Sequence, residues 1–238
     1  MKALAIVSGG LDSVTLAHFL NHHGQLKGIL SFDYGQRHKK ELIFAAQTAK
    51  RLGVPHHLID LTNITAHLKN SALTDDVPVP DGHYAADTMK QTIVPNRNAI
   101  MLAVAFGIAP AHDYNAIAIA IHAGDHFIYP DCRPEFAELF DRMEQKAMEG
   151  VANIKLLTPF VTITKADIAR HAGTLHVPIA ETWSCYKGGE IHCGRCGTCV
   201  ERREAFALAA VDDPTIYEDS TFWLDECRKK GTFPKAAS

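Results

Sequence analysis

The chain has 238 residues, of which 47% are hydrophobic and 21% charged, and it carries a formal net charge of −3 with a sequence pI of about 6.5. This length suits one large α/β domain with a proper core, and the composition is ordinary for a soluble globular protein. The acidic balance excludes a broad basic field for nucleic acid, and without an apolar run of about 18 residues we expect no membrane span.

The N-terminal segment, residues 1–7, is too short for a signal peptide and lacks a cleavage site, so we interpret it as a buried first strand. We therefore expect a cytoplasmic protein. Cysteines in that compartment serve more often as metal ligands or nucleophiles than as disulfides.

Apolar stretches alternate with helical patterns through the first half of the chain. Strands are predicted at residues 2–7, 27–33, 56–61 and 116–122, and helices at residues 13–23, 37–52 and 98–111. This order predicts a doubly wound parallel sheet with helices on both faces. Ligands of such sheets bind beyond the carboxyl ends of the strands, which here means after Val7, Phe32 and Ile121.

Residues 62–96 interrupt this alternation with prolines, glycines and many polar side chains. A structureless segment of this length in a compact domain is typically a lid or a binding loop, and a surface insertion is the plainer alternative. From Pro134 onward the pattern favours helices, with a cluster of cysteines among them.

The sequence SGGLDS, residues 8–13, joins the first strand to the first helix. Its two glycines let backbone N–H groups approach a ligand, and the helix N-terminus adds unpaired amides and a positive dipole end. Together they predict an anion cradle of phosphate size. The sequence lacks the lysine of the P-loop and does not match Gly-x-Gly-x-x-Gly. The alternative is a structural turn in which Asp12 or Ser13 caps the helix.

The sequence CYKGGEIHCGRCGTC places Cys185, Cys193, Cys196 and Cys199 at spacings that can close a tetrahedron around zinc. Four sulfur ligands would make that zinc structural, because no coordination position stays open. An iron–sulfur cluster is the main alternative, since two Cys-x2-Cys steps also suit four-iron clusters. A disulfide is a weaker alternative, and His192 could replace one of the cysteines.

The SGGLDS turn resembles the loop with which the ATP pyrophosphatase superfamily grips the β- and γ-phosphates of ATP. That resemblance implies cleavage of ATP at the α-phosphate, transfer of AMP to a substrate oxygen and departure of pyrophosphate. The missing lysine agrees with this chemistry, since no γ-phosphoryl group is transferred.

Further motifs extend the resemblance over nearly the whole chain: FDYGQRH, SALTDDVPVPDG, VPNRN, YPDCRPEF, TPF with TKADI, and the cysteine segment. In this order and spacing they resemble the 7-cyano-7-deazaguanine synthase family. The family uses ATP to activate 7-carboxy-7-deazaguanine, ammonia gives the amide, and a second activation dehydrates the amide to the nitrile, a queuosine precursor. The resemblance implies ATP, Mg²⁺ and one structural Zn²⁺ per chain as cofactors.

The resemblance also implies a domain organisation and partners. Residues 1–180 would form an α/β domain of the adenine nucleotide alpha hydrolase-like, Rossmann-like type, with residues 62–96 as a lid-like loop. Residues 181–238 would form a helical C-terminal part around the four-cysteine zinc site. We expect a homodimer that takes a deazaguanine substrate and ammonia, with no membrane partner and no nucleic acid.

Site residues are carried over from the family motifs. The predicted nucleotide-binding residues are Val7, Ser8, Gly9, Gly10, Leu11, Asp12, Ser13, Val14, Thr15, Leu16 and Ala17. The predicted catalytic residues are Asp12, Ser13, Arg97 and Lys165. The predicted substrate-binding residues are Tyr34, Gln36, Arg37, Asn98, Asp125, Tyr129 and Asp131. The predicted zinc ligands are the four clustered cysteines.

Each carried-over role has a chemical reason and a plainer alternative. Lys165 opens a predicted helix and could reach the pyrophosphate, or be a solvated first-turn lysine. Arg97 could meet the substrate carboxylate or the α-phosphate, or lie on the surface beside a helix cap. Asp125 could accept from the N1–H and the exocyclic amine of the guanine edge, or be an ordinary turn aspartate.

One departure from the family stands in the segment before Tyr129. Where the family commonly has a serine–glycine pair, this chain has Phe127 and Ile128. The alternative function is therefore a specialised relative that stops at the amide or joins the carboxylate to another amine, including one on a protein. A tRNA-modifying relative and a zinc-ribbon binding module are weaker alternatives. The nearby His122 and His126 could be bases or packing residues, with packing favoured for His122.

Overall fold

The structure is a computed structural model that describes residues 1–36, 39–68, 71–74 and 77–233. Its centre is a five-stranded parallel sheet in the order β3-β2-β1-β4-β5. The strands are β1 (Ala3–Ile6), β2 (Leu26–Asp33), β3 (His56–Asp60), β4 (Ala116–Ala118) and β5 (Lys155–Leu157). This confirms the predicted doubly wound parallel sheet.

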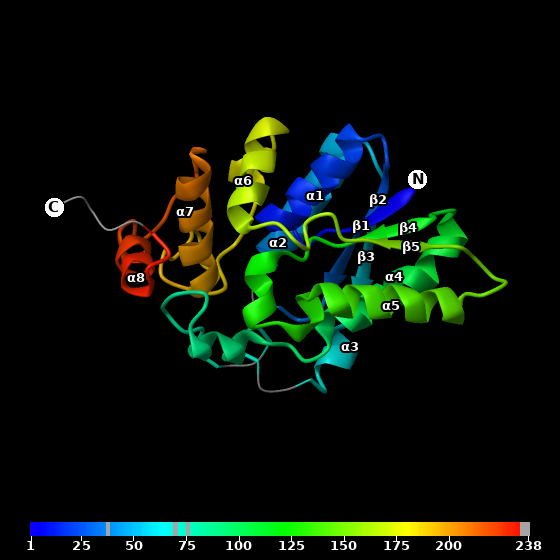
Figure 1. Ribbon diagram of the computed structural model, residues 1–238, viewed down its shortest axis with the longest axis horizontal. Coiled ribbons are helices and arrows are strands. Elements are labelled where there is room, and N and C mark those ends of the chain that lie inside the picture. The colour runs from blue at the N-terminus through cyan, green and yellow to red at the C-terminus, as the bar shows by residue number, and fades with distance from the viewer. Residues whose placement is uncertain (37–38, 69–70, 75–76, 234–238) are drawn as a thin grey trace.

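Helices cover both faces of the sheet (Figure 1). The α-helices are α1 (Leu11–His22), α2 (Lys40–Leu52), α3 (Thr62–Thr65), α4 (Arg97–Ile108), α5 (Pro134–Ala147), α6 (Lys165–Thr174), α7 (Gly197–Ala209) and α8 (Phe222–Lys230). The 3₁₀ helices are η1 (Asp87–Thr92), η2 (Ala109–His112), η3 (Ala123–Phe127), η4 (Pro130–Cys132) and η5 (Ile179–Glu181).

The alternation of side chains along β1 explains the two layers. Ala3 and Ala5 belong to the core that contains α1, α2 and α6, whereas Leu4 and Ile6 belong to the core that contains α4 and α5. Successive residues of a strand point to opposite faces, so a strand that is apolar throughout must be covered twice. Figure 1 shows α1 and α6 on one side of the sheet, α4 and α5 on the other, and α7 and α8 at one end.

One predicted strand is shorter in the structure, and one observed strand was not predicted. The strand predicted at residues 116–122 ends at Ala118, because its neighbour β5 is only three residues long and the chain then turns toward η3. The strand β5 itself was not predicted. It lies at the sheet edge and is partly exposed, so it leaves neither a long apolar run nor a clear alternation in the sequence.

The segment predicted as a lid-like loop, residues 62–96, contains α3 and η1, so the prediction that it is structureless is wrong. It also buries Ala72, Leu73, Val79, Met89 and Val94. Packing against the rest of the protein therefore orders the described part of this segment. Its movement as a lid stays a prediction.

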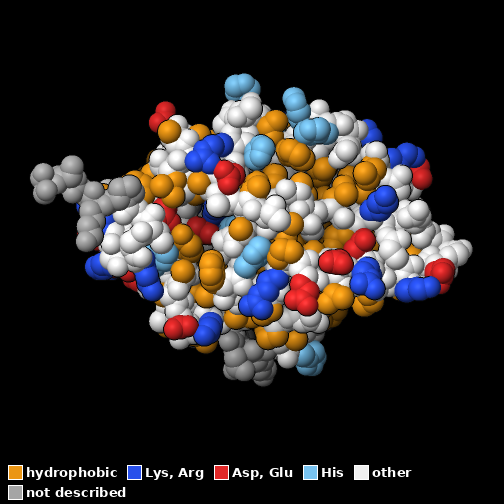
Figure 2. Space-filling model, in the orientation of Figure 1, with side chains coloured by type: hydrophobic (Ala, Val, Ile, Leu, Met, Phe, Trp, Pro, Cys, Tyr) orange, Lys and Arg blue, Asp and Glu red, His pale blue; other side chains and the backbone are white. Residues whose placement is uncertain are grey.

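One stretch of the described chain, Asp87–His112, is long and apolar enough to cross a membrane by length and composition alone. Within it, α4 buries Met101, Leu102 and Phe106 against the sheet, as the core helix of a folded domain does. The face drawn in Figure 2 carries acidic and basic side chains interspersed, without a continuous basic field.

Candidate active site

A cavity opens beyond the carboxyl ends of β1 and β4, where the connections leave the sheet in opposite directions. Its wall combines the glycine turn, α4, α6, η3 and the segment that leads into α7. The predicted site residues that line it are Ser8, Gly10, Leu11, Asp12, Ser13, Tyr34, Arg97, Asn98, Asp125, Tyr129 and Lys165. The fold thus gathers them at a topological switch point, where open α/β sheets bind their ligands.

The glycine turn leaves the N-terminus of α1 open toward this cavity. Gly9 has φ of +99°, and a Cβ there would lie 2.0 Å from the backbone oxygen of Glu41, so only glycine fits. Gly10 is the N-cap, and within the described chain no side chain caps α1. The Ser13 hydroxyl instead donates to Gly10 O at 3.1 Å. The first amides of α1 therefore stay available to an anion.

Asp12, in the first turn of α1, forms an ion pair with Lys165. The Lys165 Nζ lies 2.8 Å from Asp12 Oδ2 and 3.1 Å from Glu201 Oε2. Burial alone would raise the pKa of Asp12, but Lys165 and His122 outweigh burial and hold that pKa below its ordinary value. Burial opposes protonation of Lys165, but Asp12 and Glu201 raise its pKa. Both groups are therefore charged at neutral pH.

His122 lies beside two of the predicted carboxylates. Its Nδ1 accepts the Gly124 N–H at 3.1 Å, which leaves the proton on Nε2. That Nε2 lies 3.4 Å from Asp125 Oδ2 and 3.7 Å from Asp12 Oδ2, and it has no hydrogen-bond partner within the described chain. Although His122 is only 1% exposed, its ring presents a donor to the two carboxylates.

The part of the cavity wall around Arg97, at the start of α4, is aromatic and basic. The Arg97 guanidinium carbon lies 5.8 Å from the centre of the Tyr34 ring, and Tyr129 and Tyr186 also line this side. Glu41 lines the cavity as well, and burial raises its pKa to about 8 although Arg97 opposes that rise. This wall can hold a planar anion, because arginine and tyrosine both donate hydrogen bonds to carboxylates.

Three other predicted substrate residues lie differently. Asp131 Oδ2 accepts the Asn98 N–H at 3.0 Å, so it fixes the start of α4 rather than facing the cavity. The Gln36 amide accepts from Tyr34 N and donates to Phe32 O, so both of its ends are used within its own turn. Arg37 lies outside the described residues.

Several predicted nucleotide-binding residues are core residues that do not line the cavity. These are Val7, Val14, Thr15, Leu16 and Ala17, each fully buried. Val7 follows β1 in the core, and residues 14–17 form a turn of α1 that is buried on every side, because α1 packs against the sheet, α2 and α6. Only the first turn of α1 lines the cavity. Gly9 acts through its backbone, whose carbonyl accepts the Trp183 N–H at 3.0 Å.

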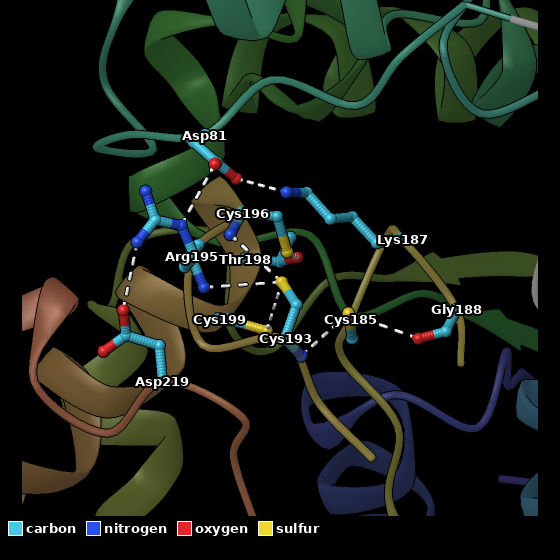
Figure 3. A network of polar contacts seen from close by, with 10 residues as sticks. All are labelled: Asp81, Cys185, Lys187, Gly188, Cys193, Arg195, Cys196, Thr198, Cys199 and Asp219. Carbon is cyan, nitrogen blue, oxygen red and sulfur yellow. Dashed lines mark hydrogen bonds and ion pairs between the residues drawn. The ribbon is translucent and has the colours of Figure 1, made fainter. Parts of the chain in front are cut away.

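The four predicted zinc ligands lie together in the C-terminal part (Figure 3). The sulfurs of Cys185, Cys193, Cys196 and Cys199 are buried and all lie within 4.8 Å of one another. The Cys193 and Cys199 sulfurs are 3.9 Å apart. Zn–S bonds of about 2.3 Å in a tetrahedron place sulfurs about 3.8 Å apart, so the group fits a single zinc ion. A four-iron cube between the cysteines would need wider spacing.

Backbone and charged groups surround these sulfurs. The Arg195 and Cys196 N–H groups donate to Cys193 Sγ at 3.4 and 3.3 Å, a pattern that stabilises thiolates. Asp81 pairs with Lys187 and Arg195, and Arg195 pairs with Asp219 at 3.0 Å (Figure 3). The cluster is thereby joined to the segment predicted as a lid and to the chain before α8.

Three charged residues at or beside the site were not predicted from the sequence: the half-buried Glu41 and the buried Glu201 and Arg202. Glu201 and Arg202 lie two and three residues after Cys199, and that position was the only available signal. Arg202 is fully buried, and it donates to Thr182 Oγ1 at 2.8 Å and pairs with Asp213 at 3.3 Å. The two residues fix α7 beside the glycine turn.

Comparisons with known proteins agree with this picture. The family model described as queuosine biosynthesis protein QueC matches residues 2–210. A protein of Rhizobium rhizogenes named 7-cyano-7-deazaguanine synthase is 64% identical over 224 residues, which is 94% of this chain and 95% of the relative. One of the same name from Brucella ovis is 63% identical over 230 residues, 97% and 99% of the two chains. NMN synthetase from Francisella tularensis has a similar fold, with a TM-score of 0.52 and 15% identity over 100% of this chain and 89% of that one.

Proposed function

Because the chain belongs to the queuosine biosynthesis protein QueC family, we propose that it converts 7-carboxy-7-deazaguanine and ammonia into 7-cyano-7-deazaguanine with ATP as the activating reagent. The observation that carries the mechanism is the meeting of a lysine-free glycine turn, Asp12 and Lys165 in one cavity. The cavity thus combines a site for the phosphate anion with a lysine cation that can stabilise the charge of the departing group.

The glycine turn and the start of α1 bind the β- and γ-phosphates through backbone N–H groups. Lys165 lies close enough to stabilise the charge that develops on the departing pyrophosphate. In the first step a carboxylate oxygen of the substrate attacks the α-phosphorus, and the bond from that phosphorus to the bridging oxygen breaks. The products are the acyl adenylate and pyrophosphate.

Ammonia then attacks the acyl carbon, AMP leaves and one proton is released, which gives the amide. In a second cycle the amide oxygen attacks the α-phosphorus of another ATP, and pyrophosphate leaves again. The adenylated amide then loses AMP and both protons on its nitrogen, which gives the nitrile. One cavity can serve both cycles, because the acid and the amide present an oxygen at the same position of the same ring.

Asp12 is suited to hold the Mg²⁺ that accompanies ATP. Asp12 Oδ1 is buried and has no hydrogen-bond partner within the described chain, and carboxylate oxygens are the ligands that Mg²⁺ prefers. The ion would shield the phosphate charge from this carboxylate. Four buried cysteines likewise suit one structural zinc ion, whose role is to hold the C-terminal part in place.

For the substrate ring we propose Asp125 and the aromatic wall. A carboxylate can accept both the N1–H and the exocyclic N–H of a guanine-like edge, and Asp125 lines the cavity on the side of η3. Arg97, the first residue of α4, also lines the cavity and can bind the substrate carboxylate that ATP activates.

The experiment is a turnover assay with 7-carboxy-7-deazaguanine, ATP, Mg²⁺ and ammonium, read by mass spectrometry of the deazaguanine product. We expect the nitrile to accumulate after transient amide. No consumption of the carboxylate in the presence of ATP and ammonium would contradict the proposed function.

A second candidate function rests on the segment before Tyr129. Ile128 lines the cavity and Phe127 is 77% exposed, where family members commonly have a serine and a glycine. This substitution could change the shape of the part of the cavity through which the amine reaches the adenylated carboxylate. If the protein is a specialised ligase, the same assay yields the amide as the end product, or a conjugate when other amines are supplied.

A further inference from the structure

The helix α7 and its N-cap carry two of the four cysteines of the cluster and a carboxylate of the cavity. Cys196 is its N-cap, Cys199 lies in its first turn, and Glu201 follows two residues later. Glu201 is 7% exposed, and its Oε2 lies 3.1 Å from Lys165 Nζ on the neighbouring helix α6. One short piece of helix therefore links the sulfur cluster to the cation of the proposed phosphate site.

Lys165 has two carboxylate partners, and they are not equivalent. Asp12 lies at 2.8 Å, and its Oδ1, which has no hydrogen-bond partner within the described chain, is the oxygen proposed to hold a magnesium ion. With that ion and the phosphates bound, Asp12 would be shared between two cations. Glu201 comes from α7 and is not assigned to that ion, so it can hold Lys165 in both states.

The structure makes room for the Glu201 carboxylate. A Cβ on Gly124 would lie 2.9 Å from both Glu201 Oε1 and His122 Cε1, which is closer than real Cβ contacts, so one of these side chains would have to shift. The helix that carries Glu201 is also fixed on its far side, since the fully buried Arg202 binds Thr182 and Asp213. The neighbouring Trp183 N–H donates to Gly9 O in the glycine turn. Glu201 is thus held at a constant place relative to that turn.

We propose that Glu201 is a positioning residue: it holds the Lys165 ammonium against the leaving pyrophosphate and thereby makes the geometry of this site depend on the cysteine cluster. The proposal rests on the function proposed above for Lys165. A buried ammonium with a single carboxylate partner can swing with that partner, and a displacement of about 1 Å can cost on the order of 10²-fold in rate.

The test compares Glu201→Ala, Glu201→Gln and the matched control Glu204→Gln in the holoenzyme. Glu204 lies three residues further along α7, is 3% exposed and accepts a hydrogen bond from Tyr84 at 2.7 Å, which glutamine can also accept. For Glu201→Ala we expect kcat of pyrophosphate release to fall on the order of 10²-fold, with KM for ATP changed less than about threefold. Glu201→Gln should be intermediate, because its amide oxygen still accepts from Lys165. Glu204→Gln should match the unmodified chain.

A second readout is independent of turnover. Lys165 has a side-chain exposure of 12%, so an amine-acylating reagent should modify it slowly in the unmodified chain and several-fold faster in Glu201→Ala, as measured by peptide mass spectrometry. Zinc content should be equal in all variants. Unchanged kcat and unchanged Lys165 labelling in Glu201→Ala would overturn the proposal, as would an equal loss in Glu204→Gln. If the unmodified chain releases no pyrophosphate, the proposed function fails, while the labelling result still decides whether Glu201 positions Lys165.

Discussion

Replacing Asp12 with asparagine should lower ATP-dependent turnover by about 10²–10³-fold, the range seen when one group that stabilises transition-state charge is lost. Lys165 and His122 hold the pKa of Asp12 below its ordinary value against the effect of burial, so the residue acts as an anion at neutral pH. Asparagine has the same shape, but it has no negative charge, so it cannot neutralise Lys165 and would bind Mg²⁺ more weakly. The measurement is kcat for pyrophosphate release at saturating ATP.

The matched control for this variant is Asp33→Asn. Asp33 ends the neighbouring strand β2, pairs with Lys39 at 2.9 Å and does not line the cavity. Its substitution should change turnover less than about twofold, because a surface ion pair contributes little. Equal losses in the two variants would contradict a specific role for Asp12.

Asp12→Asn should also change the pH dependence of stability in a defined direction. An acid whose pKa is lower in the folded than in the unfolded state stabilises the fold above its unfolded pKa, and loses that contribution as the pH falls through the folded pKa. As the pH falls below about 4, the free energy of unfolding should therefore decrease less in the variant than in the unmodified chain. Chemical denaturation at each pH provides this value.

Cys196→Ser should remove the metal and destabilise the protein together. The Cys196 sulfur is fully buried within 4.8 Å of the other three, and the binding energy of a structural zinc site is folding energy. We expect about one zinc per unmodified chain, almost none in the variant, and a loss of more than about 4 kcal/mol in the free energy of unfolding. Elemental analysis and denaturation provide the two values.

The control is Cys132→Ser, since Cys132 is buried but lies outside the cluster, beside the Asn98 amide at 3.2 Å. This variant should keep its zinc. Full metal content in Cys196→Ser would refute the four-cysteine site. A brown protein that contains iron would replace the zinc ion with an iron–sulfur cluster.

The glycine turn and the cysteine ligands could be predicted because their chemistry is local. Gly9 is needed for a positive φ and a close approach, and four cysteines within fifteen residues can close on one ion without help from the rest of the fold. The sheet was predictable for a similar reason, since β1 and β2 are buried on both faces and leave continuous apolar runs. The edge strand β5 is too short and too exposed to leave such a run.

The contacts that complete the site could not be predicted, because they arise where distant helices pack. Lys165 meets Glu201 only since α7 lies against α6, and no periodicity in either helix reveals that neighbour. Motifs also do not show how a side chain is used. Asp131 belongs to a family motif, yet its carboxylate holds the start of α4.

The most direct test of the central claim is the count of nucleotide products per nitrile formed. With 7-carboxy-7-deazaguanine and ammonium in excess, ion-exchange chromatography should find two AMP and two pyrophosphate for each 7-cyano-7-deazaguanine, because the acid and the amide are each activated once. ADP and inorganic phosphate as the only nucleotide products would contradict the account, since they would place cleavage at the γ-phosphate.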